Sequence, residues 1–193
     1  KKNKMKLVFA TNNAHKLNEI RNLAGSNFEI VSLSDMGWVD VIPETGKTIE
    51  DNASQKAFYI YEKYKFDCFA DDTGLEIEAL DKRPGVYSAR YAGESCNFED
   101  NMSKVLTELQ GITNRKACFR TVISLVIQGK EVRLEGRVDG VILNEYRGNK
   151  GFGYDPIFQP NGYKQTFAEM PLELKNAISH RGLATQKLIT FLK

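Results

Sequence analysis

Short apolar runs alternate with segments of helical periodicity along the first part of the chain. Residues 5–10 form an apolar run that predicts a buried strand, and residues 28–33 predict a second one. Residues 12–24, between them, carry Leu, Ile and Ala at helical spacing. Thr48 opens the next periodic segment and is followed by Asp51, a spacing that is typical of a capping box. Strands that alternate with helices in this way are typical of an α/β fold.

The second half of the chain is richer in strand patterns. After residue 74, apolar and acidic residues alternate as in a half-exposed strand. Two long β-rich runs, residues 117–128 and 131–142, flank a Gly-Lys pair, which predicts a hairpin. Helices are predicted over residues 97–110 and 179–192. These elements predict a mixed sheet flanked by helices, in one domain or in two lobes that share one core.

Composition and charge narrow the class of protein. The chain is 41% hydrophobic and 27% charged, which is ordinary for a soluble globular enzyme. It has no apolar run near the roughly 20 residues that cross a bilayer. The basic residues Lys1, Lys2, Lys4 and Lys6 are followed by polar residues rather than by a secretory segment, so we expect a cytoplasmic protein with no membrane partner. A net charge of +2 does not favour a stable nucleic-acid partner.

Cysteine and histidine are too sparse for two common kinds of site. Cys68, Cys96 and Cys118 include no CxxC pair, so neither a disulfide framework nor a structural zinc site is indicated. The two histidines, His15 and His180, do not suffice for a His-rich metal site.

The segment between the first strand and the first helix is a candidate phosphate site. A helix N-terminus presents unpaired N–H groups and a partial positive charge, which attract phosphate. Hydroxyl, amide and ammonium donors lie at this point of the chain. An ordinary N-cap explains the same residues equally well. The segment consists of Thr11, Asn12, Asn13, Ala14, His15 and Lys16.

Asp71-Asp72-Thr73-Gly74 is the strongest local indication of a functional site. Two adjacent carboxylates after an apolar strand are costly unless they are solvated, hydrogen-bonded or bound to metal. Magnesium prefers such oxygen ligands, and Glu44 in a preceding loop is a possible second one. The alternative is a turn, which Asp and Gly also favour. Gly46-Lys47-Thr48 is not a P-loop, because Val41 stands where that motif requires glycine.

Two further clusters lie in the C-terminal third. Phe152, Gly153, Tyr154 and Asp155 place aromatic rings in a glycine-bearing loop, where a ring can stack on a flat ligand. A turn with buried aromatic residues is the alternative. Lys175, His180 and Arg181 gather hydrogen-bond donors near the last helix, where they could read a base or only decorate a helix end.

In combination, these segments resemble the inosine triphosphate pyrophosphatase family. Seven stretches match in the order of the family and span nearly the whole chain. Asn12 departs from the glycine that many members have at this position, and Asn tolerates left-handed backbone conformations better than most residues. The matching stretches are residues 9–16, 43–46, 52–57, 70–75, 84–93, 151–158 and 178–181.

The resemblance implies a fold, a reaction and a role for each cluster. The fold would be an elongated mixed sheet with two lobes around a substrate cleft, usually in a homodimer. The enzyme would convert ITP, dITP or XTP to the monophosphate and pyrophosphate with Mg²⁺. Thr11 to Lys16 and Lys56 would hold the triphosphate, with Lys16 and Lys56 stabilising the transition state. Glu44 and Asp72 would ligate magnesium, and Asp72 would also accept the proton of the attacking water.

The same resemblance implies how the base is selected. Thr73 would touch the substrate beside the metal, and Phe152 would stack on the base. Gly153, Tyr154, Asp155, Lys175, His180 and Arg181 would shape the base pocket. Donors there would suit the 6-oxygen of inosine or xanthosine and disfavour the amino group of adenosine. The alternatives are a Maf-like pyrophosphatase for modified pyrimidine nucleotides and, more distantly, a non-enzymatic nucleotide- or RNA-binding module.

Overall fold

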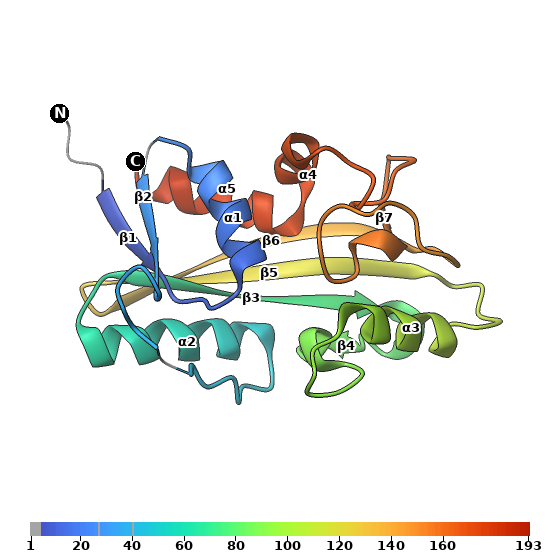
Figure 1. Cartoon of the computed structure of the whole chain (residues 1–193), viewed down its shortest axis with the longest axis horizontal. Helices are drawn as coiled ribbons and strands as arrows, with labels where there is room; N and C mark the ends of the chain where they lie inside the picture. The colour runs from blue at the N-terminus through green and yellow to red at the C-terminus, as the bar shows by residue number, and fades with distance from the viewer. Residues whose placement is uncertain (1–4, 27, 40) are drawn as a thin grey trace. The chain divides into compact units, whose positions relative to one another are not determined.

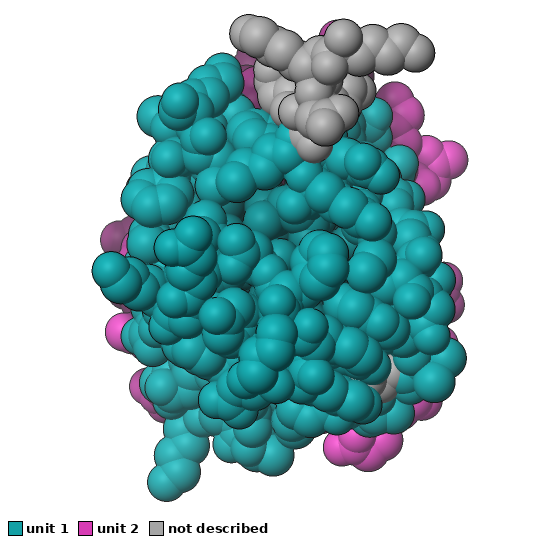
Figure 2. All heavy atoms as spheres, turned by 90° about the vertical axis from the view of Figure 1, so that its left-hand side faces the viewer, with its two compact units in different colours: residues 1–72, 121–136, 181–193 teal, residues 73–120, 137–180 magenta. Residues whose placement is uncertain are grey.

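A computed structural model describes residues 5–26, 28–39 and 41–193. The basic residues Lys1, Lys2 and Lys4, which entered the expectation about secretion, lie outside this part of the chain. The chain divides into two compact units, which Figure 2 distinguishes by colour. Unit 1 comprises residues 1–72, 121–136 and 181–193, and unit 2 comprises residues 73–120 and 137–180. The single-domain interpretation stays a prediction. No helix within the described ranges is long and apolar enough to span a membrane.

One mixed sheet connects the strands, as the sequence predicts (Figure 1). Its hydrogen-bonded order is β2-β1-β3-β5-β6-β7, with β4 paired to β3. β1 is parallel to β2 and β3, whereas β4 and β7 are antiparallel to β3 and β6. The strands are β1 (Met5–Phe9), β2 (Phe28–Ser32), β3 (Cys68–Ile77), β4 (Pro84–Gly85), β5 (Lys116–Ile127), β6 (Lys130–Ile142) and β7 (Phe158–Pro160).

Helices cap and connect these strands. Thr48 caps its helix as predicted, because its hydroxyl accepts the amide of Asp51 at 3.0 Å. Gln128 and Gly129 join β5 to β6 with φ angles of 50° and 76°, which is typical of a tight hairpin turn. The α-helices are α1 (Ala14–Ala24), α2 (Ile49–Tyr64), α3 (Phe98–Glu108), α4 (Leu172–Ile178) and α5 (His180–Phe191). Short 3₁₀ helices cover η1 (Glu78–Leu80), η2 (Ser88–Arg90) and η3 (Asp155–Ile157).

Within unit 1, strand β3 buries both of its faces. In β3, Phe69 packs with residues of α1 and α5 in one apolar cluster, whereas Cys68 and Ala70 pack with α2 in another. Figure 1 shows α1 and α5 on one side of these strands and α2 on the other. Because side chains alternate along a strand, each residue of β3 in this unit faces one helical layer or the other. Unit 2 has its own core, which includes Leu75, Phe119 and Phe158.

One local alternative is wrong, and one helix is not predicted by the sequence. β3 runs without a break from Cys68 to Ile77, so Asp71-Asp72-Thr73-Gly74 is strand and not turn. The turn propensity of Asp and Gly is overridden here by ladder hydrogen bonds and by ion pairs to the two carboxylates. Helix α4 was not predicted, because its seven residues are too few to show a helical period.

The three cysteines differ in exposure, which predicts selective labelling. Cys96 is exposed, whereas Cys68 and Cys118 are buried. Burial raises the pKa of the Cys68 thiol to about 12, so this thiol stays protonated and unreactive at about pH 8. We expect Ellman's reagent to label one thiol rapidly in the native protein and three after unfolding. Cys96→Ser should abolish the rapid phase, and rapid labelling that persists in this variant would contradict the assignment.

Candidate functional site

The loop before α1 is shaped by its own side chains. The Thr11 hydroxyl accepts the amide of Asn13 at 3.1 Å, and the Asn13 side chain accepts the amide of Lys16 at 3.1 Å. Asn13 is therefore the N-cap of α1, as one of the two interpretations predicted. Asn12 of this loop and Ala14 and His15 at the start of α1 are exposed, and all three belong to unit 1. The loop ends at Asn13, and the ammonium of Lys16, in the first turn of α1, contacts Asp71 of β3.

The adjacent carboxylates of β3 face opposite helical layers. Asp71 accepts the Lys16 ammonium of α1 at 3.0 Å. Asp72 instead accepts the Asn52 amide of α2 at 3.1 Å. The alternation of side chains along a strand explains this division. The two carboxylates therefore have different partners.

Asn52 fixes the position of Asp72. Its amide nitrogen donates to Asp72 Oδ2, while its amide oxygen accepts the Gly46 N–H at 2.7 Å. A Cβ at Gly46 would lie only 2.7 Å from that oxygen, so the close approach requires glycine. The loop that carries Glu44 is thus tied through α2 to the second carboxylate of β3.

Lys56 lies between the two predicted metal ligands. Its ammonium is 2.6 Å from Glu44 Oε1 and 3.6 Å from Asp72 Oδ1, and its side chain is buried. Burial lowers the pKa of Lys56, but Asp72 and Glu44 more than offset this and raise it. The pKa of Asp72 is raised, mainly because its carboxyl is buried. The positive charges of Lys56 and Lys16 lower this pKa, whereas the negative charges of Glu44 and Asp71 raise it further. A raised carboxylate pKa suits a group that accepts a proton.

The donor set near Lys56 fits magnesium. Within the described residues, no group of three or more His, Cys, Asp or Glu side chains could hold a metal alone. Glu44 and Asp72 supply two carboxylates, and magnesium typically takes one or two of these together with water and substrate phosphate. Two carboxylates beside buried cations therefore suit a metal that arrives with a phosphorylated ligand.

Asp71 belongs to a second buried ion network in unit 1. Arg181 of α5 donates through Nε to Asp71 Oδ2 at 3.3 Å and through its terminal nitrogen to Glu19. The Arg181, Asp71 and Glu19 side chains are each at most 5% exposed. Burial opposes ionisation of Asp71, but Lys16 and Arg181 outweigh it and hold the pKa of Asp71 well below its usual value. Burial lowers the pKa of Lys16.

A buried ion pair between Asp155 and Lys175 holds the glycine-bearing loop of unit 2, residues 151–155. Asp155 Oδ2 accepts the Lys175 ammonium at 2.7 Å and the backbone amide of Phe152 at 2.9 Å. The Lys175 and Asp155 side chains are 3% and 5% exposed. The Lys175 ammonium also lies 5.1 Å from the ring centre of Phe152. Gly151 has a φ of +71°, and a Cβ there would lie 2.1 Å from Asp155 Oδ2, so only glycine fits.

The other predicted base-pocket residues are also in unit 2, with the exception of Arg181. The Tyr154 hydroxyl donates to the backbone oxygen of Ser88 at 2.6 Å. The ring of His180 is buried and stacks on Phe119 at a centroid distance of 4.5 Å. Gly153 has a φ of +62° and open space around it, and Thr73 is half-buried. Arg181 instead contacts Asp71 in unit 1, which also accepts the Lys16 ammonium, a predicted phosphate ligand.

Sequence reasoning gave no role to three residues of these networks. Asn52 and Ser88 fall within the stretches that resemble the family, but neither type signals a function by itself. Glu19 follows Lys16 on a helix and resembles an ordinary surface residue in sequence. Only its burial and its bond to Arg181 distinguish it.

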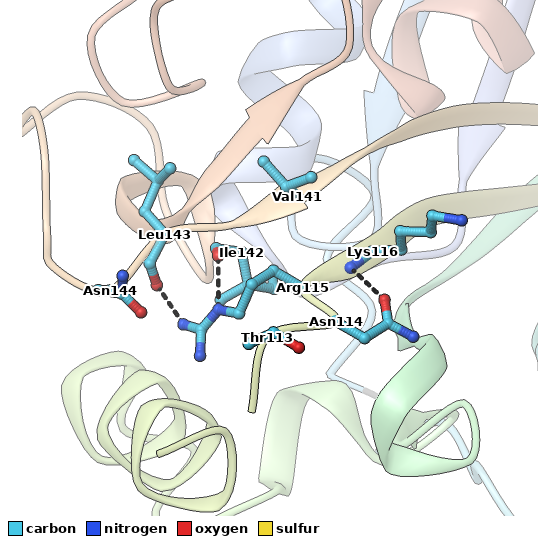
Figure 3. A pocket seen from close by; sticks show the side chains of 8 residues that line it. All are labelled: Thr113, Asn114, Arg115, Lys116, Val141, Ile142, Leu143 and Asn144. Carbon is cyan, nitrogen blue, oxygen red and sulfur yellow. Dashed lines mark hydrogen bonds between the residues drawn. The ribbon is translucent and has the colours of Figure 1, made fainter. Parts of the chain in front are cut away.

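A pocket elsewhere in unit 2 lies around Arg115, whose hydrogen bonds serve the fold (Figure 3). It is lined by Thr113, Asn114, Arg115, Lys116 and the chain from Val141 to Asn144. The Arg115 guanidinium donates to the backbone oxygens of Leu109, Ile142 and Leu143 at 2.6–2.9 Å. Arg115 thus ties the ends of β5 and β6 to the end of α3.

The fold and the site define an α/β protein in which carboxylates lie beside buried cations, a combination that suits a phosphorylated ligand. The Ham1 family model matches residues 7–191, and the chain belongs to this family. The chain is 56% identical to a dITP/XTP pyrophosphatase of Flavobacterium psychrophilum, over 98% of this chain and all of that protein. It is 53% identical to a protein of the same name from Flavobacterium johnsoniae, over 97% of this chain and 98% of that one.

A solved structure confirms the fold. The Ham1 protein of Coxiella burnetii superposes with a TM-score of 0.89 at 37% identity, over 97% of this chain and 98% of that one. The predicted mixed α/β sheet is therefore confirmed. The placement of two lobes around a cleft stays an expectation from the resemblance.

Proposed function

We propose that this chain hydrolyses non-canonical purine nucleoside triphosphates, namely ITP, dITP and XTP, to the monophosphate and pyrophosphate. The observation that carries the proposal is the pair Glu44 and Asp72, held around the buried ammonium of Lys56. This arrangement suits a magnesium-bound triphosphate. The names of the similar Flavobacterium proteins support the substrate class. A homodimer and the absence of a stable nucleic-acid partner stay predictions.

The residues of unit 1 would share the chemical step. Glu44 and Asp72 would hold a divalent metal, for which we propose Mg²⁺, and this ion would supply charge neutralisation at the phosphates and activation of water. Asp72 would help hold the ion and take the proton of the attacking water, while Asn52 keeps its carboxylate oriented. Lys16 and Lys56 would stabilise charge that develops as the bond between the first two phosphates breaks. Pyrophosphate is then the leaving group.

The residues of unit 2 would select the base. Phe152 offers a ring for stacking, and the amide of Phe152 and the ammonium of Lys175 are both anchored to Asp155. A Lys175 donor suits the 6-oxygen of hypoxanthine or xanthine and disfavours the 6-amino group of adenine. We propose that Gly153, Tyr154 and His180 shape this pocket.

Removal of the Phe152 ring should weaken nucleotide binding. Base–aromatic stacking is worth about 1–3 kcal/mol per base, so Phe152→Ala should raise the KM for ITP by roughly 5- to 150-fold. The half-buried ring contributes little to the core, so the thermal midpoint of unfolding should change little. Tyr163→Ala, at an exposed aromatic residue of the same unit, is the matched control. A KM equal to that of this control would remove the stacking role.

The proposed function is tested by an initial-rate panel with magnesium. ITP, dITP, XTP, GTP, ATP and dTTP are compared, and pyrophosphate and orthophosphate are measured separately. We expect fast pyrophosphate release from the first three. Preference for pyrimidine nucleotides would favour the Maf-like alternative. Release of orthophosphate alone would reject the mechanism, and nucleotide binding without turnover would favour a binding module.

A further inference from the structure

Four charged side chains of unit 1 form an alternating buried series. Glu19 contacts Arg181, Arg181 contacts Asp71, and Asp71 contacts Lys16. Glu19 and Lys16 both lie on α1, so the series begins and ends on one helix. The charges alternate in sign and sum to zero. Three of the four side chains are at most 5% exposed, and only Lys16, at 14%, reaches toward solvent.

The two oxygens of Asp71 are divided between two cations. Arg181 takes Oδ2, whereas Lys16 takes Oδ1. Because Arg181 neutralises part of the Asp71 charge, Asp71 holds the Lys16 ammonium less tightly than an isolated buried carboxylate would. Glu19 in turn balances Arg181, which keeps the guanidinium buried and its fork directed at Asp71.

We propose that Glu19 and Arg181 are positioning residues for the phosphate end of the site, which act through Asp71 to aim the Lys16 ammonium and leave its charge available. The inference rests on the proposed function, because it takes Lys16 to be a phosphate ligand. It gives Arg181 a role different from reading the base, and it gives Glu19 a role that no feature of the sequence indicates.

A ligand without a base separates these two roles of Arg181. Inorganic tripolyphosphate carries the phosphate charge of the substrate but no purine. The variant Glu19→Gln/Arg181→Met removes a buried pair without changing net charge, which spares the fold an unpaired buried ion. We expect it to weaken tripolyphosphate binding, measured calorimetrically with magnesium, by about tenfold. Arg21→Met/Asp35→Asn, which removes an exposed ion pair of the same unit, should leave the affinity unchanged.

Action through Lys16 is tested by a mutant cycle. Lys16→Met alone should weaken tripolyphosphate binding strongly, and adding Glu19→Gln/Arg181→Met should then cost at most about twofold more. A merely structural role of the pair would give losses that multiply, which would overturn the proposal. Unchanged tripolyphosphate binding with weakened ITP binding would also overturn it and assign Arg181 to the base.

Two controls keep the outcome decisive. If the paired variant unfolds, Arg181→Lys retains the charge but loses the fork that spans two carboxylates, and it should weaken tripolyphosphate binding in the same direction. Wild-type affinity in Arg181→Lys would contradict the proposal. Failure of the wild-type protein to bind tripolyphosphate would instead count against Lys16 as a phosphate ligand, and so against the proposed function.

Discussion

Asp72→Asn should lower kcat for ITP by about 10²–10⁴-fold, the usual contribution of a general base. The substitution removes the charge that faces Lys56 and the group that would accept the proton of water. It keeps an oxygen to accept the Asn52 amide, so the strand and the loop should retain their positions. Affinity for a non-hydrolysable ITP analogue should fall far less than kcat. Initial rates of pyrophosphate release and calorimetric binding together measure both quantities.

The control for this experiment is Asp81→Asn. Asp81 is exposed and has a φ of 52°, a conformation that Asn accepts readily. Its kcat should equal that of the wild-type protein. If Asp72→Asn retained a kcat near that of Asp81→Asn, neither the metal ligand nor the proton acceptor could be Asp72, and the proposed reaction would lose its centre.

Lys175→Met should destabilise the protein by about 3–5 kcal/mol, because it leaves the Asp155 carboxylate buried without its cation. The Phe152 amide would remain as a donor to Asp155, but it carries no full charge. The midpoint of urea-induced unfolding, followed by circular dichroism, gives the change in free energy. Lys164→Met, at an exposed lysine of the same unit, should change it by no more than about 0.5 kcal/mol.

A double variant shows whether the loss of stability in Lys175→Met is caused by the unpaired charge of Asp155. Lys175→Met/Asp155→Asn removes both charges, and the Asn oxygen can still accept the Phe152 amide. We expect this double variant to recover most of the lost stability, although its selectivity for ITP over ATP should fall. Equal stability of the single and double variants would show that packing of the Lys175 side chain, and not the ion pair, stabilises the loop.

Elements with a complete local signal could be predicted from the sequence. The first strand and helix, the cap at Thr48 and the hairpin at Gly129 each depend on spacing within a few residues, and all are present. Helix α4 has no such signal because it is too short. The local sequence leaves a turn open at Asp71 and Asp72, because the ion pairs that stabilise these carboxylates within the strand involve residues distant in sequence.

Less of the candidate site than of the fold could be predicted from the sequence. The local sequence around Asp72 and Glu44 is compatible with a metal site or with ordinary surface and turn residues, and it is the resemblance to a family that indicates their roles. The contact of Lys56 with both carboxylates follows from the packing of α2 on β3, which no spacing encodes. Glu19 and Arg181 show the limit most clearly, since they are 162 positions apart and meet only in the folded chain.

Because Asp71 and Asp72 point to opposite faces of β3, the number of strand residues before them decides which helices each carboxylate contacts. Insertion of a single residue after Ala70 would turn every following side chain to the other face of the strand. Asp71 would then meet α2, and Asp72 would meet α1 and α5. The two carboxylates are identical in chemistry, yet they could not exchange tasks by point substitution. Their roles depend on whether each stands at an odd or an even position along the strand, so a change in the length of this segment should exchange their partners.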